Sequence, residues 1–102
     1  MVIVVDFDGT LVENGDYPFA RNPIIKNIQY IKKMKSEGHK IILWTCREKE
    51  SLENAIKFCD YYDIELDVIN ENVDIEGKIK SFGYNSRKVY ADIYLDDKAM
   101  KR

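Results

Sequence analysis

The residues VIVVDFDGT at positions 2–10 join a short apolar run directly to two aspartates. A short run of valine and isoleucine is typical of a strand that is buried on both faces of a parallel sheet. Asp6 and Asp8 would lie at its carboxyl end, where open parallel sheets bind their ligands. Alternate residues of an extended chain point to the same side, so the two carboxylates should be close together. Such carboxylates repel each other unless a cation or a shared proton relieves the repulsion, which suggests a metal site.

A second acidic pair lies near the other end of the sequence. Residues 91–95, ADIYL, are typical of another buried strand, and Asp96 and Asp97 follow it directly. Either acidic pair alone could simply mark a turn, where aspartate is common. Together they place four carboxylates at two strand ends, a hard-oxygen set that suits Mg2+. We therefore expect Asp6, Asp8, Asp96 and Asp97 to form one Mg2+ site.

Strand and helix signals alternate between these two acidic pairs, which predicts an α/β fold with a mainly parallel sheet. Strands are expected at residues 2–5, 40–45, 64–69 and 91–95. A first helix is expected to start with Asn22 as its cap and Pro23 as its first residue, and to end at Gly38. A second helix should carry an apolar stripe from Leu52 to Tyr62, and residues 74–87 allow a further short helix.

Length and charge restrict the class of protein. A chain of 102 residues fits a single domain spanning residues 1–102, and a net charge of −2 gives no basic field that would attract nucleic acid. Nucleic acid is therefore an unfavoured partner, although the charge does not exclude it. No apolar stretch has the length of a membrane span or a signal peptide, so a cytoplasmic protein is expected. Cys46 and Cys59 have no metal-binding spacing, and we expect both thiols to be reduced and buried.

Two polar residues lie at or just after the end of the second predicted strand. Thr45 would end that strand beside the acidic pair, where its hydroxyl could bind a phosphate oxygen, or it could simply cap the next helix. Arg47 should lie near the same crevice. It could bind an anionic substrate or form a structural salt bridge, and the sequence favours neither role.

The motif Asp6-Phe7-Asp8-Gly9-Thr10-Leu11 resembles the first signature of the haloacid dehalogenase superfamily. Thr45 resembles the second signature, a lysine ahead of the last strand the third, and Asp96-Asp97 the fourth. The resemblance covers nearly the whole chain in the right order. It implies a Rossmann-like three-layer sandwich without a cap domain, and a Mg2+-dependent phosphatase that acts through a phospho-aspartyl intermediate.

The resemblance also implies a role for each acid. Asp6 would be the nucleophile, and Asp8 would protonate the leaving oxygen and then activate water. Mg2+ would be held by Asp6, Asp96 and Asp97 and by the main-chain carbonyl of Asp8. An acid two residues after the nucleophile favours a phosphatase, because a threonine at that place would resemble the ion-pumping ATPases of the superfamily instead.

The remaining site residues are expected to contact the phosphoryl group. Lys88 is our choice for the lysine of the third signature because it precedes the last strand most closely, and Lys78 and Lys80 are the alternatives. The residues expected to bind substrate are Gly9, Thr10, Cys46 and Arg47.

The sequence has no room for a cap domain, which leaves the predicted crevice open. An open crevice suits a phosphorylated macromolecule, or a small substrate covered by a neighbouring subunit of a homo-oligomer. Nucleotides, sugar phosphates and phosphorylated polynucleotide ends all remain possible substrates. Tyr17, Phe19 and Arg21 could form a small flap over the site, or the aromatic side chains could cover the edge of the core. Two non-enzymatic alternatives are a receiver-like signalling domain and a phosphate-binding module without catalysis.

Overall fold

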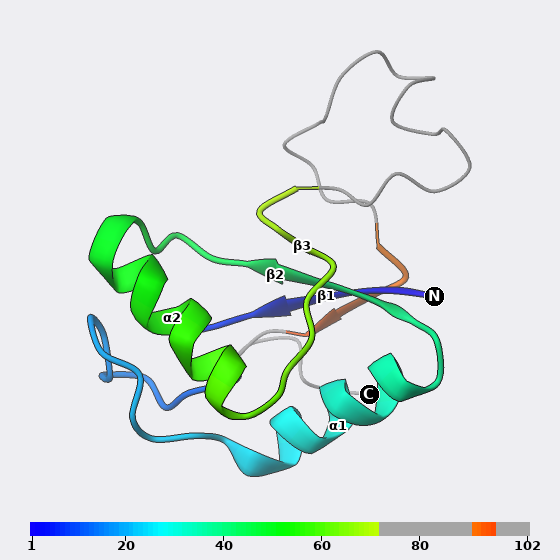
Figure 1. Cartoon of the computed structure of the whole chain (residues 1–102), viewed down its shortest axis with the longest axis horizontal. Helices are drawn as coiled ribbons and strands as arrows, with labels where there is room; N and C mark the ends of the chain where they lie inside the picture. The colour runs from blue at the N-terminus through cyan, green and yellow to red at the C-terminus, as the bar shows by residue number, and fades with distance from the viewer. Residues whose placement is uncertain (72–90, 96–102) are drawn as a thin grey trace.

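The structure, a computed structural model, describes residues 1–71 and 91–95 of the chain. Its elements follow one another in an alternating α/β order (Figure 1). They are β1 (Val2–Asp6), α1 (Ile25–Ser36), β2 (Lys40–Trp44), α2 (Lys49–Tyr61), β3 (Val68–Ile69) and β4 (Ile93–Leu95). The short helix predicted within residues 74–87 lies outside the described residues.

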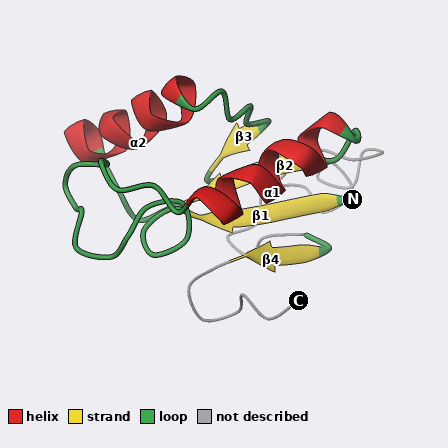
Figure 2. Ribbon diagram, turned by 90° about the horizontal axis from the view of Figure 1, so that it is seen from below, coloured by secondary structure: helices red, strands yellow, loops and turns green. Residues whose placement is uncertain are grey.

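The strands form one parallel sheet in the order β3-β2-β1-β4 (Figure 2). Val5 pairs with Leu43 of β2 and with Leu95 of β4, so the carboxyl ends of these strands meet at one edge. The chain proceeds outward from β1 through β2 to β3, whereas β4 adds to the other side of β1. The strand order therefore reverses between β1 and β4, and open α/β sheets bind ligands at the carboxyl side of such a switch point.

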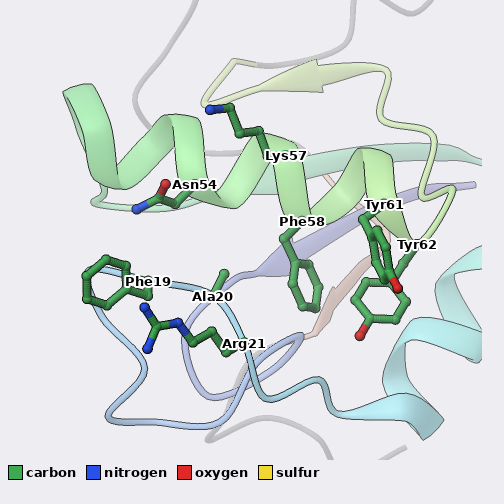
Figure 3. A pocket seen from close by; sticks show the side chains of 8 residues that line it. All are labelled: Phe19, Ala20, Arg21, Asn54, Lys57, Phe58, Tyr61 and Tyr62. Carbon is green, nitrogen blue, oxygen red and sulfur yellow. The ribbon is translucent and has the colours of Figure 1, made fainter.

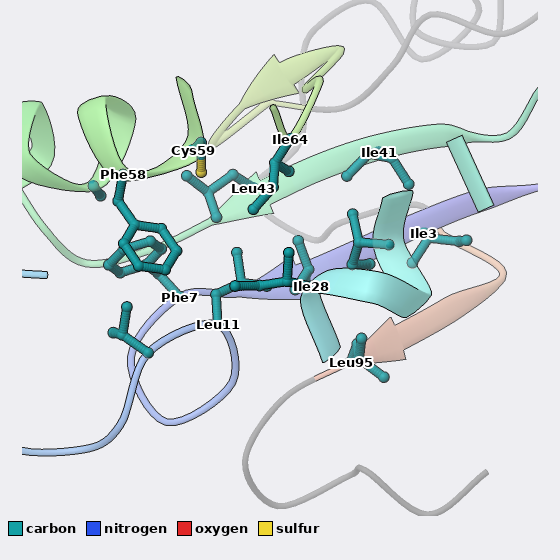
Figure 4. Packing of buried hydrophobic residues seen from close by; sticks show 14 of the residues in the cluster. Ile3, Phe7, Leu11, Ile28, Ile41, Leu43, Phe58, Cys59, Ile64 and Leu95 are labelled. Atoms are coloured by element: carbon teal, nitrogen blue, oxygen red, sulfur yellow. The ribbon is translucent and has the colours of Figure 1, made fainter. Parts of the chain in front are cut away.

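The core lies between the sheet and both helices (Figure 4). Alternate residues of the strands, such as Ile3 and Val5, belong to the same buried cluster as Ile31 of α1 and Phe58 of α2. Both helices therefore cover one face of the sheet. Val2, Val4 and Ile42 point to the other face and are buried as well. The described residues supply two layers of the predicted three-layer sandwich, and the second helical layer is not among them.

The start of α1 differs from the prediction. The helix begins at Ile25, and the predicted cap Asn22 lies outside it. The Asn22 side-chain amide and main-chain N–H both donate to the Asp16 carboxylate, at 2.6 and 2.7 Å. The N–H of Ile24 donates to the carbonyl of Leu11 at 2.8 Å. Ile24, the residue that precedes the helix, is extended, so the predicted helix start was wrong by two residues.

The end of α1 agrees with the prediction. Gly38 has a φ of 93°, in the left-handed region that favours glycine. Its N–H donates to the carbonyl of Lys35, and the N–H of His39 donates to that of Met34. This pair of hydrogen bonds defines a Schellman cap, which satisfies carbonyls that the helix itself leaves unpaired.

The same cap ends α2, but with aspartate in place of glycine. Asp63 has a φ of 57°, and the N–H of Ile64 donates to the carbonyl of Cys59 at 2.8 Å. Ile64, the first residue of the strand predicted at 64–69, belongs to this cap, and β3 is observed only at Val68–Ile69.

Asp67 lies just before β3 and connects this part of the chain to α1 and β2. Its carboxylate accepts the N–H of Ile41 at 2.7 Å and the Lys35 ammonium at 2.9 Å. Burial alone would raise the pKa of this carboxyl group. The hydrogen bonds from Ile41 and Lys35 and the charge of Lys35 outweigh burial, so the pKa of Asp67 is lowered below its ordinary value.

Candidate active site

Asp6 and Thr45 lie side by side at the carboxyl edge of the sheet. Asp6 is the last residue of β1 and pairs with Trp44, the last residue of β2, which Thr45 follows. One carboxylate oxygen of Asp6 accepts the N–H of Phe7 at 2.9 Å. The Thr45 hydroxyl accepts the N–H of Arg47 at 3.1 Å. Both side chains are half-buried at this edge, as their positions at strand ends predict.

The chain after β1 turns sharply and places Asp8 near Asp6. The carbonyl of Phe7 accepts the N–H groups of Thr10, Leu11 and Val12, at 2.9 to 3.3 Å. The turn requires a φ of 83° at Gly9, which glycine adopts without steric cost. Phe7 and Leu11 are completely buried. They therefore anchor the turn in the core, while Asp8 remains partly exposed.

Arg47 forms a bidentate ion pair with Asp8. Its Nε and Nη2 atoms donate to the two carboxylate oxygens of Asp8, at 2.9 and 2.7 Å. Its other donors reach the carbonyls of Pro18, Phe19 and Ser51, at 2.8 to 3.1 Å. Arg47 is 3% exposed. All five N–H donors of the guanidinium therefore have partners. Of the two roles predicted for Arg47, the structure shows the salt bridge.

The ion pair affects whether the Asp8 carboxylate could bind a metal ion. Both oxygens of its carboxylate accept hydrogen bonds from Arg47, while its side chain remains 32% exposed. A metal ion bound by that carboxylate would have to compete with the guanidinium.

Thr10, one of the residues expected to bind substrate, turns its side chain into the protein interior. It is completely buried, and its hydroxyl has no hydrogen-bond partner in the part of the chain that the structure describes. Its carbonyl accepts the side-chain amide of Asn27 at 2.8 Å. Asn27 is buried on α1 and was missed by sequence reasoning, because a single asparagine on a helix carries no signal of its partner.

The cysteines differ from each other in exposure. Cys46 is exposed because it lies in the loop after β2, so the prediction that it is buried was wrong. Cys59 is buried on α2, as predicted, and burial raises the pKa of its thiol to about 12. The Cys59 thiol is therefore un-ionised at neutral pH and unreactive.

The loop between β1 and α1 is held by Asp16 and Arg47. The Asp16 carboxylate accepts the N–H groups of Asn22 and Arg21, and these hydrogen bonds lower its pKa. Phe19 is 48% exposed, and the Arg21 guanidinium lies 4.2 Å above its ring. Phe19 and Arg21 thus contact each other at the surface of this loop.

The other half of the predicted site lies outside the described residues. That half consists of the acids Asp96 and Asp97 and the candidate lysines Lys88, Lys80 and Lys78. In residues 1–71 and 91–95 alone, no three acidic, histidine or cysteine side chains are grouped to bind a metal ion. Neither α1 nor α2 has the length and hydrophobicity that a bilayer-crossing helix needs.

The chain matches the haloacid dehalogenase-like hydrolases over residues 3–101. It belongs to that family, whose members are hydrolases. The parallel sheet with its two helices is the Rossmann-like core of the family, and the described residues include no cap domain. The resemblance seen in the sequence motifs is thereby confirmed.

Two solved structures are similar to the chain. A conserved protein encoded by a locus of Bacteroides thetaiotaomicron shares 37% identity with a TM-score of 0.79, and the match covers 98% of this chain and 78% of that one. A chain of the Pnkp1/Rnl/Hen1 complex shares 21% identity with a TM-score of 0.58, covering 94% of this chain and 37% of that one. The second likeness concerns the fold alone. No curated protein matches the chain.

Proposed function

We propose that this hydrolase is a Mg2+-dependent phosphatase that cleaves phosphate monoesters through a phospho-aspartyl intermediate on Asp6. The observation that carries the proposal is the pair of acids after β1, with Asp6 at the sheet edge and Asp8 held by Arg47. This arrangement supports Asp6 as the attacking group and Asp8 as the group that transfers protons.

Asp6 is the proposed nucleophile because it ends β1 at the switch point of the sheet. A phosphate dianion repels a carboxylate, so the charge of the phosphate must be neutralised before Asp6 can attack phosphorus. Bound Mg2+ would supply that neutralisation. Asp6, the carbonyl of Asp8, Asp96 and Asp97 offer the oxygen donors that Mg2+ prefers, which makes this donor set chemically suitable.

Asp8 is the proposed general acid and base. Its carboxyl group would give a proton to the leaving oxygen, and its carboxylate would then take one from the water that cleaves the phospho-enzyme. The bidentate contact with Arg47 fixes the plane of the carboxylate, which supports this role by reducing the number of orientations it can adopt. Arg47 thus acts as a positioning residue in the proposal.

The receiver-like alternative is disfavoured by the strand order. Receiver-type sheets have the order 2-1-3-4-5, in which β1 lies between β2 and β3. In this chain β2 lies between β1 and β3. The third strand is therefore not beside β1, where a receiver would carry its phosphorylated aspartate.

The decisive test is a panel of nucleotides, sugar phosphates and phosphorylated oligonucleotide ends, assayed for phosphate release with Mg2+ and with EDTA. We expect turnover of some members with Mg2+, and loss of at least 1,000-fold in Asp6→Asn, because the nucleophile is gone. Asp60→Asn, on the exposed surface of α2, serves as the matched control and should retain full activity. Turnover by Asp6→Asn at the wild-type rate would eliminate the proposed nucleophile.

The intermediate and the lysine can be tested in the same system. Borohydride reduces an acyl phosphate, so treatment during turnover should convert Asp6 to homoserine, which mass spectrometry of peptides detects. Lys88→Met, Lys80→Met and Lys78→Met should be assayed side by side. We expect the greatest loss of kcat in Lys88→Met, and a greater loss in either other variant would reassign the third signature.

A further inference from the structure

A pocket of about 520 Å³ lies between residues 19–21 of the β1–α1 loop and one face of α2 (Figure 3). Its lining positions on α2 are 54, 57, 58 and 61, a helical spacing that places them on one face, and Tyr62, which follows the helix, lines it as well. The volume is in the range of small-ligand sites. None of the residues assigned above to catalysis is among the described residues that line it.

The charge of this pocket is opposite to that of the chain as a whole. Arg21 and Lys57 line it, and no carboxylate does so among the described residues, although the net charge of the chain is −2. Asp16 binds the main-chain N–H of Arg21 without lining the pocket. A second pocket, on another side of α2, is lined by acids that include Asp60 and Glu65, and by no described cation. Charge is thus segregated across α2, and the first pocket favours an anion.

The same pocket presents aromatic rings to solvent. Phe19 and Tyr61 are 48% and 79% exposed. The Arg21 guanidinium stacks 4.2 Å from the centre of the Phe19 ring, and Tyr61 contacts Tyr62 at a centroid distance of 4.9 Å. Exposed rings beside a cation are suited to stacking on a planar ligand.

The pocket shares a wall with the catalytic site. The carbonyl of Pro18 accepts hydrogen bonds both from Arg47 and from the Asn54 side chain, which lines the pocket. The carbonyl of Phe19 also binds Arg47, while its ring lines the pocket. Arg47 in turn holds Asp8. A ligand in the pocket would therefore press on the peptide that positions the proposed acid.

We propose that this pocket binds an aromatic anion, a ligand with a planar ring and a negatively charged group. The ligand is either the leaving-group part of the phosphate ester or a separate effector. Binding at the pocket does not depend on the proposed phosphatase activity. Only the choice between leaving group and effector rests on that activity.

Calorimetric titration of the full chain with 2-naphthalenesulfonate tests the binding, since this ring-bearing anion offers no phosphate for hydrolysis. We expect one site per chain, with binding at least threefold weaker for neutral 2-naphthol. Lys57→Met should weaken sulfonate binding roughly threefold, and the double variant with Arg21→Met about tenfold. Lys32→Met, an exposed lysine of α1, is the matched control and should bind as the wild type does. Equal affinity for both probes, or equal affinity in the Lys57→Met and control variants, would overturn the proposal.

Phe19→Leu separates stacking from charge. We expect it to weaken the sulfonate severalfold while circular dichroism remains that of the wild type, because Phe19 is exposed. Unchanged affinity in this variant would refute the stacking role.

Steady-state kinetics then assigns the source of the ligand, with any phosphate ester that the panel shows to be hydrolysed. A rise in KM at constant kcat on adding the sulfonate would identify the pocket as the leaving-group site. A fall in kcat at constant KM would identify an effector site. A chain without phosphatase activity leaves the calorimetric result intact, so failure of the two proposals can be distinguished.

Discussion

Arg47 connects several parts of the candidate site. It joins Asp8 to Pro18 and Phe19 of the loop and to Ser51 of α2, and it stacks 4.7 Å from the centre of the Phe7 ring. Removing a buried cation leaves its acceptors unpaired, which costs more than the ion pair itself contributes. Arg47 should therefore affect stability and turnover together.

We predict that Arg47→Met lowers the free energy of unfolding by roughly 2–4 kcal/mol, because Asp8 and three carbonyls lose their partner. Arg47→Lys should fall between this variant and the wild type, since lysine keeps the charge but lacks the planar fork. Urea denaturation measures the change. Arg21→Met, which removes an exposed arginine, is the control and should lie within about 0.5 kcal/mol of the wild type. A similarly small effect of Arg47→Met would contradict the stabilising role of this network.

The ends of the two helices show the same cap built from different residues. Gly38 and Asp63 both occupy the left-handed position, but only glycine adopts it without steric cost. An aspartate at this position keeps the hydrogen bonds of the cap and retains backbone strain. The two positions are therefore a natural matched pair.

We predict opposite effects of exchanging these residues. Asp63→Gly should raise the free energy of unfolding by about 0.5–1 kcal/mol, and Gly38→Asp should lower it by about 1 kcal/mol. Thermal or urea unfolding measures both. A loss of stability in Asp63→Gly would show that the Asp63 side chain contributes more than its backbone strain costs.

Asp67 links α1 and β2 to the residues before β3, and its lowered pKa makes this link dependent on pH. A carboxyl group whose pKa is lowered by folding stabilises the folded state at pH values above its ordinary pKa, which is 3.8 here. This stabilisation is lost as the pH falls through the pKa of the folded state. We predict that Asp67→Asn is less stable than the wild type by roughly 1–2 kcal/mol at pH 7, and that the difference shrinks progressively below pH 3.8. Urea unfolding across this range measures it.

Asp60→Asn is the control for this pH series. It changes an exposed carboxylate of α2 and should follow the wild type throughout. A difference between Asp67→Asn and the wild type that stays constant down to pH 2 would argue for a packing effect instead of a charge effect.

At the scale of the whole molecule, the sheet order makes β1 and β4 neighbours although their residues lie at opposite ends of the sequence. Val5 pairs with Leu95, one residue before each acidic segment begins. The proposed metal site depends on this pairing, because each strand supplies only part of the ligand set. Metal binding should therefore require acids from both strands.

We predict that saturating Mg2+ raises the Tm of the wild type by roughly 5 °C or more, since a ligand that binds only the native state stabilises it. Asp6→Asn and Asp96→Asn should each lose most of this shift, whereas Asp60→Asn should retain it. Differential scanning calorimetry with Mg2+ and with EDTA measures the shift. An equal response in all variants would show that Mg2+ binds elsewhere.

Local patterns in the sequence were enough to predict the alternating elements, the strand ends that carry Asp6 and Thr45, and the family. These features depend on short-range chemistry, since a buried strand needs an apolar run and a tight turn needs Gly9. The Gly38 cap was predictable for the same reason. The predicted starts of α1 and β3 were wrong. Contacts with Asp16 and Leu11 hold the residues before α1, and Ile64 belongs to the cap of α2 and not to β3.

Tertiary structure alone decided the environment of Asp8. Its partner Arg47 is 39 positions away, and the ion pair forms only because β2 lies beside β1 and the loop folds back over α2. The cationic pocket arises in the same way, from a loop and a helix that the sequence separates. A sequence reveals which groups a chain carries, but the distances between groups far apart in it depend on how its strands and helices pack.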